Sequence, residues 1–127
     1  MDFLFKSIDF EKSYLDFLKV KNHTILSNLA NAETPFYKRL KAELIKNEDE
    51  IPLKTTNPKH ISNIPQNPFA YKIVQDKSGL VGADGNNVSV EKEMVELEKV
   101  ALKYEAILKF MQGNFQSLDL VIKGLGG

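Results

Sequence analysis

The sequence predicts a mainly α-helical fold in which long N- and C-terminal helices pair as a coiled coil around a proline-rich, irregular middle. Apolar residues recur in alternating four- and three-residue steps in both end regions, which is the spacing of a coiled-coil seam. All five prolines lie between residues 35 and 68, where they interrupt regular structure. We therefore expect an N-terminal amphipathic helix over 1–32, a middle segment over 33–87 and a C-terminal heptad helix over 88–127, together forming one assembly domain.

The N-terminal helix carries a seam that two polar residues interrupt. The seam positions are Leu4, Ile8, Glu11, Leu15, Leu18, Asn22, Ile25, Leu29 and Ala32. Phe10, Tyr14 and Phe17 widen the apolar face, so we expect this helix to touch more than one neighbour. Glu11 and Asn22 fit two interpretations, a register-fixing role inside the seam or a helix face that partly meets solvent.

The middle segment begins where Pro35 ends the first helix near residue 32, because the residue before a proline is pushed toward extended backbone. A basic cluster with one aromatic follows: Tyr37, Lys38, Arg39 and Lys41. Such a cluster can contact phosphate, but a solvated helix start or loop is the more common outcome. Residues 47–68 hold four of the prolines and an acidic run, which predicts a loop. Residues 69–74 alternate apolar and polar side chains before a turn at 76–79, which indicates a short strand or β-hairpin.

The C-terminal helix has the stronger seam, with an apolar residue at every step. These residues are Val90, Met94, Leu97, Ala101, Tyr104, Leu108, Met111, Phe115, Leu118, Ile122 and Leu125. A turn at 82–87 precedes the helix, and Asn87 or Ser89 is suited to cap it. The acids of the first turns are expected on the solvated face, namely Glu91, Glu93, Glu96 and Glu98. Gly113 indicates a bend or a close approach of two backbones.

The composition and residue types argue against several classes of function. Seventeen basic and seventeen acidic residues cancel, so bulk charge does not favour nucleic acid. The chain has no cysteine, and His23 and His60 lack the partners and spacing of a helical metal site. Residues 84–95 do not form a calcium loop, because valines occupy positions that need oxygen ligands. Phosphate-binding glycine loops and nucleophile motifs are missing as well, so we expect no cofactor, no metal and no catalysis.

The N-terminus and the hydropathy bear on location. The first residues, MDFLFKS, place an acid where a signal peptide needs positive charge. No apolar stretch of about eighteen residues occurs, so we expect no membrane-spanning helix. The apolar start of the chain leaves a membrane-surface amphipathic protein open as an alternative, although nearby acids oppose binding to anionic lipid.

Residues 28–38, NLANAETPFYK, closely resemble the N-terminal signature of the bacterial flagellar rod and hook family, Asn-hydrophobic-Ala-Asn-x-x-Thr-Pro-Gly-Tyr-Lys/Arg. The matching positions are Asn28, Ala30, Asn31, Thr34, Pro35, Tyr37 and Lys38. Phe36 replaces the usual glycine, which argues against a tight positive-φ turn and suggests local packing of its ring. A second set of residues resembles the proximal-rod branch of this family, namely Asn57, Pro58, His60, Gly85, Asn86, Asn87 and Val88.

This resemblance implies a structural subunit of the flagellar basal body, in the periplasmic rod, that serves motility. It implies export by the flagellar type III apparatus without a cleaved signal peptide. The implied partners are other copies of the chain, other rod subunits, and the MS ring and export gate at the rod base. A cytosolic coiled-coil adaptor and another rod-family subunit are the alternatives, since both would share the two seams.

Overall fold

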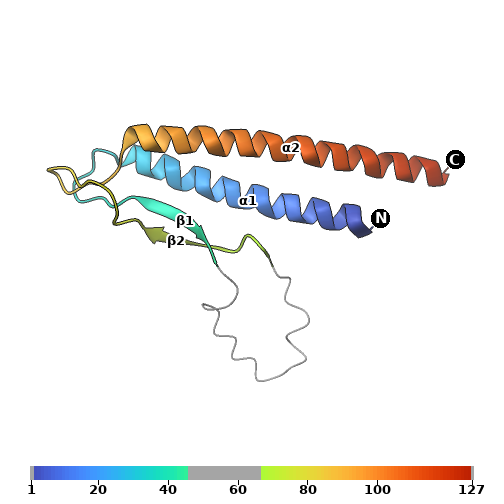
Figure 1. Cartoon of the computed structure of the whole chain (residues 1–127), viewed down its shortest axis with the longest axis horizontal. Helices are drawn as coiled ribbons and strands as arrows, with labels where there is room; N and C mark the ends of the chain where they lie inside the picture. Colours follow the sequence, from blue (N-terminus) through green and yellow to red (C-terminus); the bar gives the residue numbers. More distant parts are fainter. Residues whose placement is uncertain (1, 46–66, 127) are drawn as a thin grey trace, which may run out of the picture.

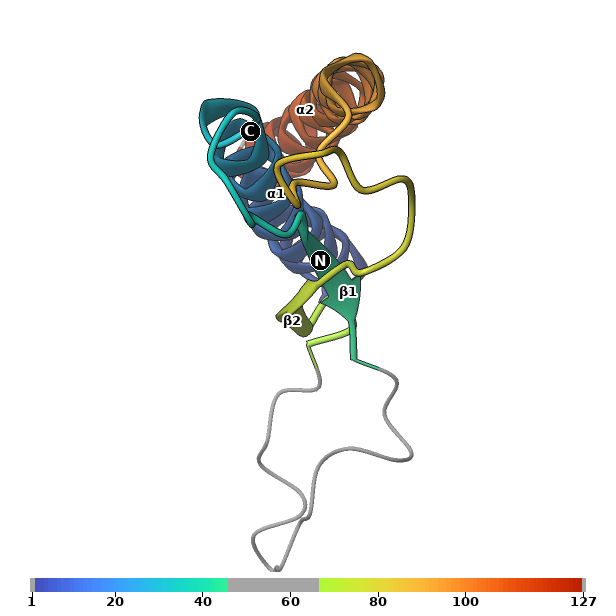
Figure 2. The same cartoon turned by 90° about the vertical axis from the view of Figure 1, so that its left-hand side faces the viewer.

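The computed structural model describes residues 2–45 and 67–126 of the chain. These residues form helix α1 (Asp2–Ala30), strands β1 (Leu40–Leu44) and β2 (Tyr71–Gln75), and helix α2 (Val90–Gly126). The helices run side by side and antiparallel, and the small sheet lies against α1 (Figure 1). Figure 2 shows the same layers from the end at which α1 finishes and α2 begins. The mainly helical fold with paired terminal helices is confirmed, whereas the loop predicted at 47–68 lies outside the described residues up to position 66.

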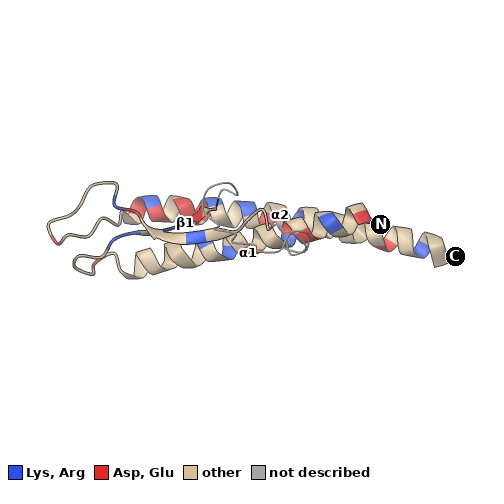
Figure 3. Cartoon of the chain, turned by 90° about the horizontal axis from the view of Figure 1, so that it is seen from below, with Lys and Arg blue, Asp and Glu red and all other residues tan. Residues whose placement is uncertain are grey.

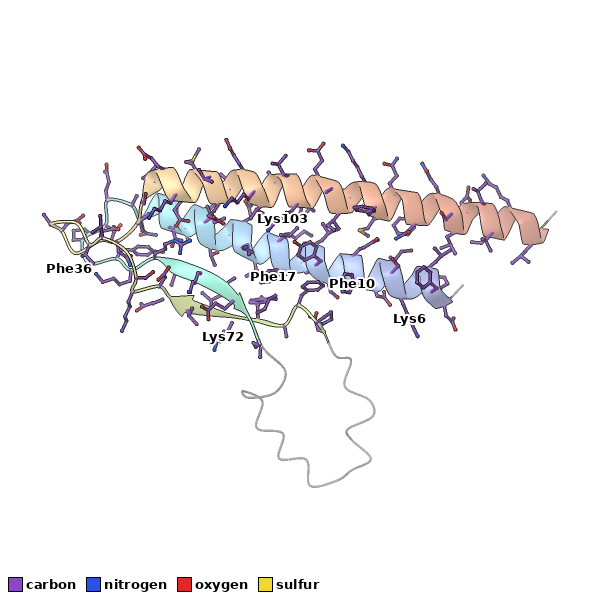
Figure 4. The ribbon with its side chains drawn as sticks, in the orientation of Figure 1. Lys6, Phe10, Phe17, Phe36, Lys72 and Lys103 are labelled. Atoms are coloured by element: carbon purple, nitrogen blue, oxygen red, sulfur yellow. The ribbon has the colours of Figure 1, made fainter. Side chains whose placement is uncertain are left out.

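Helix α1 buries the seam that the sequence predicts. Every seam position is buried or half-buried, and Leu15, Leu18 and Ile25 are each less than 9% exposed. The helix packs on α2 along this seam and on β1 along an adjoining face, as its width predicts. On the second face Phe69 contacts three aromatic rings of α1, with centroid distances of 5.0 Å to Phe10, 4.9 Å to Tyr14 and 6.4 Å to Phe17. Figure 4 labels Phe10 and Phe17 on α1.

Helix α2 buries a stripe that overlaps the predicted seam only in part. The stripe of buried or half-buried residues is Glu93, Leu97, Val100, Tyr104, Ile107, Met111, Asn114 and Leu118. It shares every second residue with the predicted seam, while the other seam positions are exposed, namely Val90, Met94, Ala101, Leu108, Phe115, Ile122 and Leu125. The apolar face of α2 is wide enough for two neighbouring 4-3 ladders, and packing against α1 selects one of them.

The sheet is smaller and differently connected than the sequence indicates. Strands β1 and β2 pair antiparallel, with Leu40 opposite Gln75 and Leu44 opposite Tyr71. The strand predicted at 69–74 is therefore confirmed with a small shift, but the turn at 76–79 does not close a hairpin. Its partner β1 lies where we expected a helix start or loop, because this strand forms only against β2 and the side of α1.

Candidate assembly interface

The family motif at 28–38 and residues 85–88 of the second motif meet at one end of the molecule, where the chain leaves α1 and later enters α2 (Figure 1). The amide of Asn86 donates hydrogen bonds to the carbonyl oxygens of Asn31 and Thr34, both at 2.8 Å. The backbone N–H of Phe36 donates to the carbonyl of Asp84 at 2.9 Å. These bonds connect the loop before α2 to the loop after α1. We call these contacts, together with those of Asn28, Arg39, Asp76 and Glu93 described next, the polar junction.

Asn28 is the centre of the polar junction, with 0% exposure. Its Nδ2 donates to the carbonyl of Leu40 at 2.8 Å and to Glu93 Oε2 at 3.3 Å. Its Oδ1 accepts from the backbone N–H of Leu40 at 2.9 Å and from the hydroxyl of Tyr37 at 3.0 Å. One side chain thus ties α1, the start of β1 and the start of α2 together, and it leaves none of its own polar atoms unpaired.

Glu93 corrects the expectation that the acids of α2 lie on a solvated face, because its side chain is 0% exposed. Arg39 Nε donates to Glu93 Oε1, and Arg39 Nη1 donates to Asp76 Oδ2 at 2.7 Å. Arg39 is therefore a structural cation held by two carboxylates, and not part of a solvated basic cluster. The position of Glu93 in the sequence is compatible with burial, because Glu93 stands four residues before Leu97 in the buried stripe of α2.

The electrostatics of the junction favour its ionised form. Hydrogen bonds from the Ser78 hydroxyl and backbone N–H, with help from Arg39, lower the pKa of Asp76 from 3.8 to about 2. Burial acts to lower the pKa of Arg39, but the hydrogen bonds and charges of Glu93 and Asp76 outweigh it and raise that pKa. Arg39 is thus held between two carboxylates, each of which has a further hydrogen-bond donor, Asn28 at Glu93 and Ser78 at Asp76.

Phe36 adopts φ +62°, so our expectation against a positive-φ turn at this residue was wrong. The turn survives because the Phe36 N–H bond to Asp84 and the approach of Gly85 hold the backbone in place. A Cβ atom on Gly85 would lie 2.7 Å from Phe36 Cδ1, so only glycine fits at that position. The Phe36 ring packs on this glycine but is 79% exposed at the end of the molecule (Figure 4).

The remaining motif residues also lie at the junction. Lys38 Nζ donates to the Gly85 carbonyl, and Asn87 Oδ1 accepts from the Arg39 N–H at 2.7 Å. Asn86 Oδ1 accepts from the Val88 N–H at 2.8 Å. Ala30 is the last residue of α1 and Pro35 is exposed in the turn that follows; Asn57, Pro58 and His60 lie outside the described residues.

Beyond the junction, α2 presents a row of exposed apolar residues beside the seam that it shares with α1. We call it the outer row, and it consists of Met94, Ala101, Leu108, Phe115 and Ile122. Exposure of the four larger side chains is between 45% and 53%. Charged residues thin out toward the C-terminal end of α2, which runs past the N-terminus of α1 (Figures 1 and 3).

A groove runs between the two helices next to the outer row. It has a volume of about 440 Å³. Leu18, Val100 and Tyr104 contribute to its lining together with Ala101 and Leu108 of the outer row. Further along α2 a shallower hollow continues beside Leu108, Met111 and Phe115. The groove is lined mainly by apolar side chains, which suits another apolar helix better than a charged ligand, while the second hollow also has Gln112, Gln116 and Asp119 in its lining.

Two further features were sought in the described residues. Within 2–45 and 67–126 there is no group of three or more His, Asp or Glu side chains placed to hold a metal ion. Over the same residues, neither α1 nor α2 has an apolar run long enough to cross a membrane.

Comparisons with known proteins place the chain in a family. No family model matches it. It is 43% identical over 121 residues to the flagellar basal body rod protein FlgB of Aquifex aeolicus, covering 95% of this chain and 96% of that protein. It is 32% identical to FlgB of Bacillus subtilis, covering 83% and 84%, and 31% identical to FlgB of Borreliella burgdorferi, covering 93% and 96%. The chain therefore belongs to the FlgB family of flagellar basal body rod proteins.

Proposed function

We propose that this chain is a structural subunit of the proximal rod in the flagellar basal body, and that the outer row of α2 is the surface by which it packs against helices of neighbouring subunits. The observation that carries the proposal is a regular row of half-exposed apolar residues beside a seam that is already filled. Membership of the FlgB family agrees with a structural role in the rod and disfavours both an enzyme and a cytosolic adaptor.

The spacing of the outer row supports helix packing as its purpose. Its members recur every seven residues, so they follow one side of α2 for most of its length. Together with Leu97, Tyr104, Met111 and Leu118 they complete the second 4-3 ladder, which is the seam that the sequence predicts. A helix with two adjacent ladders can contact two neighbours at once, one inside the chain and one outside it.

The energy available from this surface is moderate. Completing the burial of one half-exposed large apolar side chain contributes roughly 1 kcal/mol. The outer row could therefore contribute several such increments, before the costs of association are subtracted. Because each contact contributes little, this surface is better suited to an ordered assembly of many copies than to tight binding of a single partner.

In the proposal, the polar junction holds the two helices in position and is not itself the contact surface. Its hydrogen bonds fix the angle at which α1 and α2 leave the loops, so the groove and the outer row keep a constant shape. Residues 1–32, 33–87 and 88–127 would in this way act as one assembly domain. The two motifs serve to hold the junction, and the seam residues serve to build the contact surfaces.

Assembly with other rod components and a place in the basal body follow from the family. Further partners are part of the proposal: other copies of the chain, and the MS ring and export gate at the base of the rod. Export of the chain by the flagellar type III apparatus, without a cleaved signal peptide, also belongs to it. Support for these finer points comes from the motif resemblance described above.

The outer row can be tested with Leu108→Asp and the matched control Leu102→Asp. Both residues are exposed leucines of α2, but Leu102 lies outside the outer row. In a strain that lacks the chain, we expect Leu108→Asp to abolish incorporation into purified basal bodies and swimming, and Leu102→Asp to retain both. Circular dichroism should show equal helix content in the two variants. Normal rods built from Leu108→Asp would refute the proposed surface.

A further inference from the structure

The helix pair contains two buried carboxylates, one from each helix, and each meets an asparagine of the opposite helix. Near the polar junction, Glu93 of α2 accepts from Asn28 Nδ2 at 3.3 Å. Toward the other end, Glu11 of α1 accepts at Oε1 from Asn114 Nδ2 at 2.7 Å. Both crossings lie on seams that are otherwise lined mainly by apolar side chains.

The Glu11 crossing is a poor source of stability. Glu11 is 8% exposed, and its Oε2 is buried without a hydrogen-bond partner. The Asn114 amide also donates to the Ser7 hydroxyl at 3.1 Å, so both of its N–H groups are used and neither reaches the second carboxylate oxygen. A buried charge that is only half satisfied costs more than an apolar pair of similar size. Its presence in the middle of a seam therefore calls for a benefit other than stability.

That benefit is selectivity in a chain with more than one apolar ladder. Leu4, Ile8, Leu15 and Leu18 of α1 could pack on any helix that presents apolar residues in 4-3 steps. The outer row, together with Leu97, Tyr104, Met111 and Leu118, offers such steps on every copy. Moving α1 by one heptad along α2 would bring Glu11 to the level of Ile107 or Val121, neither of which can donate a hydrogen bond from its side chain. A single buried polar pair in a seam is the best-attested device for fixing register and partner.

We propose that the Glu11–Asn114 contact directs the first half of α1 onto α2 of its own chain, in one register, and rejects pairing with the apolar helices of other subunits. Its biological purpose rests on the proposed function, because only an assembly brings many similar helices together. The contact itself is a property of the isolated chain. Its test therefore succeeds or fails independently of the rod assay.

The experiment exploits the absence of cysteine from the chain, which lets spin labels be placed at chosen positions only. One sample of chains carries a label at Lys12→Cys in α1, and a second carries a label at Gln112→Cys in α2. Both positions are exposed. When the two samples are mixed, a signal between chains at the short label distance found within one doubly labelled chain arises only if α1 of one chain takes the place of α1 on α2 of another.

We expect no such signal from the parent chain or from Glu11→Gln, which keeps the oxygen that accepts from Asn114. The double variant Glu11→Leu/Asn114→Leu should give a clear signal between chains, and its denaturation midpoint should equal or exceed that of the parent. Asn22→Leu is the matched control. It makes a different, half-buried seam position of α1 apolar without removing a carboxylate, so it should give no such signal between chains.

Four results would overturn the inference. The first is a double variant that shows no pairing between chains, and the second is a control that pairs as much as the double variant. The third is a double variant that unfolds at a clearly lower denaturant concentration, since the contact would then serve stability. The fourth is a signal between chains at that same short distance in the parent.

Discussion

The two ends of the helix pair differ in how they are held. At the junction end, Asn28 and Glu93 are fully buried, and their polar atoms meet partners from both helices and from β1. At the other end, Phe3 is 81% and Leu125 76% exposed. One end is held by hydrogen bonds within the chain, which require a fixed geometry. The other end exposes apolar side chains, whose contacts do not depend on direction. The contrast shows a subunit that fixes its own geometry at one end and leaves the rest to be covered by neighbours.

The largest loss of stability is expected from a substitution at Glu93, at the junction end of the helix pair. Glu93→Ala removes the buried partner of both Arg39 and Asn28, so we expect the free energy of unfolding to fall by roughly 3–5 kcal/mol. Glu91→Ala, at an exposed acid two residues earlier, should change it by less than about 0.5 kcal/mol. Urea unfolding followed by circular dichroism measures both. Equal effects of the two variants would mean that the junction does not hold the helix ends.

A second prediction compares an inner leucine with an outer one. Leu18 is 1% exposed and belongs to the core with Ile25 and Val100. Leu18→Ala should therefore lower the free energy of unfolding by roughly 2–4 kcal/mol. Leu108, at 45% exposure, should lose less than about 1 kcal/mol as alanine in the isolated chain. The same urea titration tests both, and a large loss at Leu108 would show that the outer row is already buried in the free chain.

The junction should also weaken in acid. Because the folded-state pKa of Asp76 lies below its ordinary value, ionised Asp76 stabilises the fold fully above about pH 4, and this contribution is lost as the pH falls toward 2. The denaturation midpoint of the parent should thus drop over this range more steeply than that of Asp76→Asn. Parallel pH profiles for the two chains would contradict the assigned role of Asp76.

The smallest effect is expected at the exposed tip of the junction. Phe36→Gly relieves the positive-φ backbone of a non-glycine residue, and should raise the free energy of unfolding by up to about 1 kcal/mol. Phe36→Ala keeps the strain and loses the ring contact, so it should give no gain. Thermal unfolding of both variants checks this. A destabilised Phe36→Gly would mean that the ring contact with Gly85 outweighs the strain.

Some structural features of single residues could be predicted from the sequence, and others could not. The seam of α1 followed directly from its periodicity, whereas the sequence left open whether Glu11 lies inside that seam or on a partly solvated face, and the structure buries it. Strand β1 carried no such signal, because its pairing depends on β2 and on the Asn28 side chain from α1. The positive φ of Phe36 was equally hidden, since the contacts that hold it come from residues 84–85, far along the chain.

The sequence by itself determined that both ends of this chain are helices with apolar ladders, and that its motifs match the flagellar rod family. These features are local, because periodicity and a short signature can be read along one segment. Only the tertiary structure decided which ladder of α2 faces α1, why Glu93 is buried, and which apolar row is left outside. Two ladders on one helix are equivalent until a partner approaches from a particular direction, and that direction is set by hydrogen bonds between residues distant in sequence.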